Sequence, residues 1–324
     1  MPAPRPWRDC SAAADGQSAP ASFGPYAITV DRANASFPTY RPVSLKAAIW
    51  PVLVFMHGSG SDDRFMSPST MRWASHGFIV VTPLMGIEAL CTTPAQDANC
   101  SDHSPDGVYI QAGISWIRER NAGSLDPVYY RRVDTDRIAI GGWSMGGVTA
   151  IRAASALPSG VVKAVILDSP SVRYCETLYN YTREGIDHDV QMARKNTAGV
   201  APWFVYTATN DLLQNASLSL FESAGNSSSI IYAQYQQRVC KDKPLFLNTT
   251  IWEATWQVLP GFRGHCCAGL DTMIGWTTTF LKETLQQRSN SSSACIALLY
   301  GNGSDAMASD ARMDDVRLHR ESHR

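Results

Sequence analysis

The chain has 324 residues, of which 44% are hydrophobic and 18% are charged, and its formal net charge is −1. This length accommodates one large α/β domain or two small domains, and the hydrophobic fraction excludes wholesale disorder. The balanced charge gives no basis for nucleic-acid binding, which needs clustered Lys and Arg. The longest apolar run, residues 47–56, is half of the roughly twenty residues that a spanning helix needs, so we expect no transmembrane segment.

Short apolar runs alternate with helical patterns along the middle of the chain. Strands are expected at residues 48–56, 78–82, 137–141, 161–167, 203–208 and 252–259, and helices at 64–75, 108–120, 145–156, 212–223 and 270–287. Continuous apolar strands that alternate with helices form mostly parallel sheets covered on both faces. The pattern therefore predicts an α/β fold. Two polar segments, 169–200 and 236–251, interrupt the pattern and are interpreted as surface excursions.

The two ends of the chain differ in composition from the middle. Residues 1–22 are rich in Pro, Ala and Ser, which predicts a flexible lead. Residues 300–324 contain a Gly-rich start and then mixed charges, which predicts a disordered tail. We expect residues 23–299 to form one α/β domain between them.

Asparagine is placed unusually in this chain, because eight of the eleven asparagines open an Asn-X-Ser/Thr sequon. The eight are Asn34, Asn99, Asn180, Asn215, Asn226, Asn248, Asn290 and Asn302. About two would be expected by chance at this Ser and Thr content. The excess indicates a glycoprotein that is secreted to the extracellular space. Accidental sequons on a Ser-rich surface are the alternative.

The eight cysteines fit the same compartment, because an even number is typical of disulfide-bonded secreted proteins. Their pairing does not follow from the sequence, although Cys91 and Cys100 flank a short polar loop and form the best local pair. Residues 1–22 contain no apolar h-region of a signal peptide. A removed signal peptide, a gene model that begins too late and a protein that is not secreted all remain open.

Zinc binding is the alternative explanation for His265-Cys266-Cys267. A structural zinc site needs four ligands, and they usually come as two spaced pairs. No Cys-X-X-Cys or His-X-X-X-His pair accompanies this tripeptide, so we expect no metal.

A glycine-rich motif, Gly142-Trp143-Ser144-Met145-Gly146-Gly147, follows an apolar strand and opens a helical stretch. This is the setting of a nucleophile elbow, in which a tight turn raises a Ser hydroxyl above the sheet's carboxyl edge. Glycines two positions before and after the Ser remove the Cβ atoms that would clash in such a turn. The motif predicts Ser144 as a nucleophile.

A Ser hydroxyl attacks a carbonyl only when a base accepts its proton and a carboxylate orients that base. In this type of site the chain order is Ser, acid, His. Asp211 follows an apolar strand and is the predicted acid, while Asp168, at the end of the preceding strand, is the alternative. His265 is the predicted base, because His319 and His323 lie in the charged tail.

The negative charge that develops on the attacked carbonyl needs backbone N–H donors. Met145, at the start of the helix after the nucleophile, is one predicted donor. Ser59 is the second, because it lies in the small-residue loop after the strand at 48–56. His57 precedes Ser144 in the chain and is interpreted as structural.

These motifs resemble the α/β-hydrolases, and within them the poly(ethylene terephthalate) hydrolase and bacterial cutinase branch. Gly24-Pro25-Tyr26 is similar to the opening of that branch, and Ala74-Ser75-His76-Gly77-Phe78 to its helix-to-strand junction. The resemblance implies an α/β-hydrolase catalytic domain and an ester substrate, with no cofactor. It implies the nucleophile Ser144, the acid Asp211, the base His265, the oxyanion amides of Ser59 and Met145, and a substrate contact from Trp143.

The departures from that branch concern the substrate. An aromatic residue usually stands at the position of Ser59, and a Trp that binds aromatic polyester stands at the position of Ser171. An active-site disulfide of these enzymes would need Cys at Ala208, so Cys267 must pair elsewhere. These differences favour short acyl esters over aromatic polyester.

Several functions share these features. We expect a monomeric serine carboxylic ester hydrolase. A lipid esterase similar to platelet-activating-factor acetylhydrolases has comparable His-Gly and Ala-Ser-His-Gly-Phe patterns, and an amidase would use the same triad. A catalytically silent glycoprotein that uses the hydrolase fold for binding is the alternative from another class, although such proteins typically lose a triad residue.

Overall fold

The structure is a computed structural model, and it describes fourteen ranges of the chain. They are residues 26–45, 48–58, 61–64, 66–84, 107–172, 182–198, 201–209, 211, 213–223, 229–236, 270–286, 292–301, 306–310 and 313–319. The predicted lead at residues 1–22 and the predicted strand at 252–259 lie outside these ranges.

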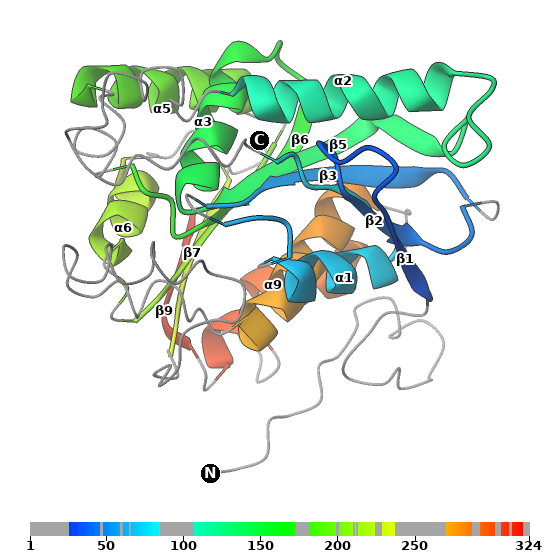
Figure 1. Ribbon diagram of the computed structural model, residues 1–324. Helices are drawn as coiled ribbons and strands as arrows, with labels where there is room; N and C mark the ends of the chain where they lie inside the picture. The colour runs from blue at the N-terminus through cyan, green and yellow to red at the C-terminus, as the bar shows by residue number, and fades with distance from the viewer. Residues whose placement is uncertain are drawn as a thin grey trace.

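One sheet runs through the described part of the chain, in the order β1-β2-β4-β3-β5-β6-β7-β8-β9 (Figure 1). Its strands are β1 (Ile28–Asp31), β2 (Thr39–Pro42), β3 (Trp50–Met56), β4 (Ile79–Val81), β5 (Val133–Trp143), β6 (Val162–Asp168), β7 (Trp203–Ala208), β8 (Ile230–Tyr235) and β9 (Met313–His319). The six strands from β4 to β8 pair in parallel, whereas β1, β2 and β9 join antiparallel at the two ends.

Helices cover both faces of this sheet (Figure 1). One face carries α2 (Val108–Ala122), α3 (Met145–Ala156) and α5 (Arg183–Thr197), and the other carries α1 (Ser67–Ser75) and α9 (Leu270–Leu285). The remaining described helices are α6 (Gln214–Glu222), α10 (Ser292–Tyr300) and the short 3-10 helix η6 (Met307–Ser309). The predicted mostly parallel sheet with helices on both faces is confirmed.

The central strands are continuous apolar runs because both of their faces are covered. All seven residues of β3 are buried, and successive side chains alternate between the two layers of the core. Val52 and Val54 pack in the layer under α2 and α3, whereas Leu53 and Phe55 pack in the layer under α1 and α9. This arrangement brings the carboxyl ends of β3, β5, β6 and β7 to one edge of the sheet.

The polar segment 169–200 is not only a surface excursion, because it contains the helix α5. Thr182 caps the helix by accepting a hydrogen bond from the Gly185 N–H at 3.2 Å. Ile186, Val190 and Ala193 recur at helical spacing and are buried in the core beside α3. A single apolar stripe among many polar residues was too narrow to stand out in the sequence.

The predicted disordered tail is also wrong for residues 313–319, which form β9 and pair antiparallel with β8. Val316 and Leu318 pack against the core, whereas Asp315 and Arg317 form an ion pair on the strand. Edge strands commonly carry charged side chains because one of their sides has no neighbouring strand. The mixed charges of this segment therefore belong to an edge strand.

Two further observations concern disulfide bonding and membrane spans. Cys295 in α10 is 3% exposed and is disulfide-bonded. Among the described residues, no helix combines the length and the apolar character that crossing a bilayer requires.

Candidate active site

Ser144 lies at the turn between β5 and α3, with φ of 57° and ψ of −118°. A positive φ is a strained conformation for a residue other than Gly, and it persists only where surrounding contacts enforce it. Here the Ser144 N–H donates to the Asp168 carbonyl at 2.9 Å. Its own carbonyl oxygen accepts from the N–H groups of Gly147 at 3.0 Å and Ser171 at 3.1 Å. Three backbone hydrogen bonds thus fix the turn.

The glycines around Ser144 allow backbone segments to touch. A Cβ atom added to Gly142 would lie 2.2 Å from the carbonyl carbon of Gly146. A Cβ atom on Gly146 would lie 2.2 Å from the carbonyl oxygen of Met56, at the end of β3. No side chain fits at either position. Both positions therefore require glycine, as the sequence motif predicted.

The loop after β3 passes directly over this turn. A Cβ atom on Gly58 would lie 2.5 Å from the Trp143 ring and 3.1 Å from Cβ of Ser144. Ser59, the next residue, lies outside the described residues. On the other side of Ser144, the N–H of Met145 is the first of α3 and has no partner within the helix. None of the hydrogen bonds found for the described residues uses this N–H.

His57 belongs to the structure of this loop. It is 3% exposed, and its Nδ1 lies 2.8 Å from the Gly58 carbonyl oxygen. A carbonyl oxygen only accepts, so Nδ1 carries the proton and donates it to this bond. Burial lowers the pKa of His57 below its usual value, although Asp62 and Asp63 act in the opposite direction. The imidazole is therefore held neutral at neutral pH.

Trp143, at the end of β5, is almost completely buried. The side chain that we expected to contact substrate is 2% exposed and packs in the core with Phe55 and Trp73. Trp143 is the last residue of β5, and strand alternation directs it into the layer under α1 and α9. Its ring supports the Gly58 loop from below and offers almost no surface to a substrate.

Asp211 follows β7 and is 4% exposed. Its Oδ2 accepts a hydrogen bond from the Ser169 hydroxyl at 2.7 Å, and its Oδ1 accepts one from the Leu213 N–H at 2.7 Å. Because Ser169 follows Asp168, whose carbonyl binds the Ser144 N–H, a short chain of contacts links Ser144 to Asp211. Ser169 and its neighbour Thr207 were missed in the sequence, since neither belongs to a recognisable motif.

Asp168, the alternative acid, is the last residue of β6 and is fully buried. Burial raises the pKa of Tyr206 well above its usual value, and the charge of Asp168 and a hydrogen bond to it add to this effect. Asp168 lies beside Tyr206 in the sheet, because these two residues are paired in register between β6 and β7. A fully buried carboxylate within a strand is less suited to orient a base in a loop than one that follows the strand end.

His265, the predicted base, lies outside the described residues, as do Cys266 and Cys267. Within the described ranges, no group of three or more His, Cys, Asp or Glu residues could hold a metal ion.

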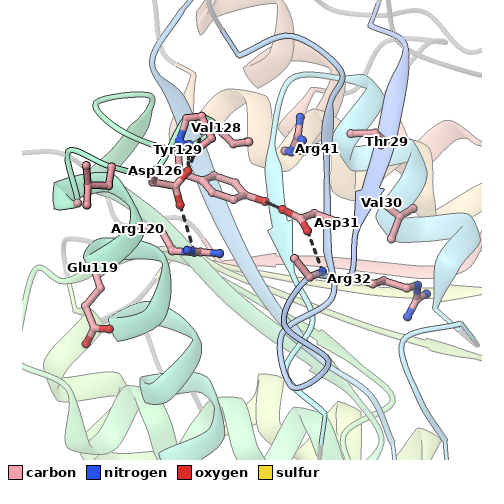
Figure 2. A pocket seen from close by; sticks show the side chains of 14 residues that line it. Thr29, Val30, Asp31, Arg32, Arg41, Glu119, Arg120, Asp126, Val128 and Tyr129 are labelled. Atoms are coloured by element: carbon pink, nitrogen blue, oxygen red, sulfur yellow. Dashed lines mark hydrogen bonds and ion pairs between the residues drawn. The ribbon is translucent and has the colours of Figure 1, made fainter.

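A pocket of about 680 Å³ lies elsewhere, beside β1 and the end of α2 (Figure 2). Its charged side chains largely satisfy one another: the Tyr129 hydroxyl donates to Asp31 at 3.1 Å, and Arg120 lies 3.2 Å from Asp126. Tyr129 lies just before the start of β5, whereas Ser144 follows its end. The pocket is therefore at the opposite end of that strand from the turn at Ser144.

A mostly parallel sheet with a serine at a strained strand-to-helix turn defines the α/β-hydrolase fold. Residues 21–175 match the family model PETase, which is described as PET hydrolase-like. The match confirms the resemblance to the polyester-hydrolase branch, and it supports hydrolysis of esters as the general kind of function. It includes Ser144 and ends before Asp211. No curated protein matches the chain.

Proposed function

We propose that this protein is a serine carboxylic ester hydrolase in which Ser144 is the nucleophile, His265 the base and Asp211 the acid. The observation that carries the proposal is the backbone of Ser144, which is held at positive φ between two glycines that no other residue could replace. Such strain is maintained at sites where it serves a function.

In the proposed reaction, His265 accepts the hydroxyl proton as Ser144 Oγ attacks the ester carbonyl. The N–H groups of Met145 and Ser59 stabilise the oxyanion of the tetrahedral intermediate. His265 then returns the proton to the departing alkoxide, which leaves as an alcohol. A water molecule, deprotonated by His265, attacks the acyl-enzyme, and as the acyl–Oγ bond breaks His265 returns the proton to Ser144 Oγ and the carboxylic acid is released. Asp211 orients His265 and stabilises its protonated form in both halves of the cycle.

The proposed substrates are short soluble acyl esters. Ser171 stands where aromatic-polyester hydrolases have a Trp, and the structure leaves Ser171 3% exposed and Trp143 2% exposed. Neither residue presents an aromatic ring on which a terephthalate unit could stack. This supports a site that binds small acyl groups better than aromatic polyester.

We also propose that the protein is secreted and monomeric. The disulfide at Cys295 supports an oxidising compartment, where such bonds persist. The sequons at Asn34 and Asn215 support passage through a glycosylating pathway, and the structure leaves Asn215 exposed on α6.

The test is an ester chain-length series, from p-nitrophenyl acetate upward, with Ser144→Ala as the control. We expect the wild type to favour the shortest chains and the variant to lose roughly a thousandfold or more in rate. The wild-type rate should fall on the acid side of about pH 6.5, where a histidine base becomes protonated. Equal turnover by Ser144→Ala would refute the proposal, and an inactive wild type would favour the silent binding protein.

A further inference from the structure

Ser169 has an unusual backbone for a serine, since its φ is 43° and the next residue is Pro170. A following proline narrows the conformations of the residue before it. The turn is nevertheless fixed, because the Ser169 N–H donates to the Tyr206 carbonyl at 2.8 Å. Ser169 is also fully buried. This is a second strained serine at the same edge of the sheet as Ser144.

The strained backbone directs the hydroxyl of Ser169 at the predicted acid. Its Oγ lies 2.7 Å from Oδ2 of Asp211 and 3.2 Å from the hydroxyl of Thr207. A serine has one hydroxyl proton, and a carboxylate accepts without donating, so that proton lies toward Asp211. The Leu213 N–H holds the other carboxylate oxygen at 2.7 Å. Because each oxygen accepts a hydrogen bond, the carboxylate is held against rotation.

We propose that Ser169 is a positioning residue that orients the Asp211 carboxylate and tunes its basicity. This inference rests on the proposed function, in which Asp211 orients His265. Asp168 and Ser169 together also connect the acid to the nucleophile, because the Asp168 carbonyl accepts a hydrogen bond from the Ser144 N–H. The segment at the end of β6 thus connects the end of β5, at Ser144, with the end of β7, at Asp211.

A donor to a carboxylate stabilises its charged form and weakens its attraction for a nearby cation. Removing the Ser169 hydroxyl therefore makes Asp211 a stronger partner for protonated His265. The pKa of the base rises, and the acid side of the rate profile moves to higher pH. The carboxylate is also freer to rotate, which lowers the turnover rate without changing how the substrate binds.

The direct test is Ser169→Gly, assayed by p-nitrophenyl butyrate hydrolysis across pH. Glycine accepts a positive φ without strain, so this variant removes the hydroxyl and keeps the backbone. We expect kcat to fall by about tenfold to a hundredfold with KM nearly unchanged. We also expect the acid limb of kcat/KM to move to higher pH, while the melting temperature stays close to that of the wild type.

Ser217→Ala is the matched control. Ser217 is equally buried, and its hydroxyl donates to the Leu213 carbonyl at 3.0 Å within α6 and its cap. We expect this variant to keep the wild-type kcat and pH profile. If it shifts the acid limb as Ser169→Gly does, then loss of any buried hydroxyl has this effect and the inference is wrong.

Two results with Ser169→Gly would overturn the inference. One is a wild-type kcat with an unmoved acid limb. The other is a lower kcat together with a lower melting temperature and an unmoved limb, which would indicate a merely structural serine. Ser144→Ala in the same assay distinguishes failure of this inference from failure of the proposed function. If Ser144→Ala is inactive, only the role of Ser169 has failed, whereas an active Ser144→Ala removes the proposed function and this inference with it.

Discussion

The turn at Ser144 and the segment around Asp211 lie at the same edge of the sheet but are held in different ways. The turn is fixed by backbone atoms, because glycines let β3, β5 and α3 come into contact. Asp211 is fixed by hydrogen bonds, including one from a serine 42 positions earlier in the chain. Steric exclusion tolerates no added atom, whereas a hydrogen bond can be removed with little change in shape. The two regions should therefore fail differently when they are altered.

The largest expected effect concerns the acid. Asp211→Asn keeps one acceptor oxygen for the Leu213 N–H, and its NH2 group can donate to the Ser169 hydroxyl oxygen, but it cannot hold the base in its reactive tautomer. We expect a folded protein whose kcat is lower by about 10⁴-fold. Asp168→Asn, measured beside it, should lose far less activity because Asp168 is fully buried within the sheet beside Tyr206. The opposite ranking of the two variants would assign the acid role to Asp168.

The turn is tested by stability rather than by rate. Gly146→Ala places a Cβ atom 2.2 Å from the Met56 carbonyl oxygen, and backbone atoms cannot move aside easily. We expect a loss of about 3 kcal/mol or more in the free energy of unfolding, measured with urea. Gly160→Ala is the control, since it has positive φ but no atom within 4 Å of the new Cβ. It should lose about 1–2 kcal/mol from backbone strain alone. Equal losses would mean that contact at the turn does not matter.

Substrate scope tests whether the surface over the turn lacks aromatic contacts. Stacking of one ring contributes about 0.5–1.5 kcal/mol beyond the area that it buries. Without two such contacts, we expect release of product from aromatic polyester film to be about tenfold to a hundredfold lower than for a known polyester hydrolase at equal butyrate activity. Aliphatic polyester should be hydrolysed better than the aromatic one. Comparable release from the aromatic film would show that residues outside the described ranges supply the missing contacts.

The smallest effect concerns His57 in the loop over the turn. Burial lowers the pKa of His57 in the folded protein. The His57 imidazole is therefore protonated in the unfolded chain at pH values where it stays neutral in the folded protein. The contribution of His57 to the free energy of unfolding is present above the usual histidine pKa of about 6.5. It is lost as the pH falls below that value. The expected slope approaches about 1.4 kcal/mol per pH unit.

Urea unfolding of the wild type and of His57→Gln at several pH values below 7 measures this slope. The variant should lack the part of the slope that His57 supplies. If both proteins lose stability in parallel as the pH falls, then other groups account for the acid sensitivity.

The sequence predicted most parts of the fold that depend on continuous or regularly spaced apolar residues, but it missed the buried strand β8. The strand at 203–208 and the helix at 145–156 have the predicted bounds, and β3, β4, β5 and β6 differ from their predictions mainly at the ends. The short edge strands β1 and β2 escaped prediction because a strand of four residues has too few positions to show a period. The edge strand β9 and the helix α5 were hidden by their charged and polar faces.

In the candidate site too, some features could be predicted from the sequence and others could not. The turn at Ser144 could be predicted because its requirement for glycine acts within six residues of sequence. The orientation of Asp211 could not, because it depends on a hydroxyl from the end of another strand. The burial of Trp143 likewise depends on which face of β5 the last residue occupies.

The central claim is that Ser144 is the nucleophile, and a fluorophosphonate ester tests it most directly. Attack by a serine Oγ displaces fluoride and leaves a stable phosphonyl group on that oxygen. We predict that hydrolysis of p-nitrophenyl butyrate stops as one group is incorporated per chain, and that peptide mass mapping finds the added mass on Ser144. Full loss of activity with the label on another residue, or continued hydrolysis by a protein fully labelled at Ser144, would contradict the claim.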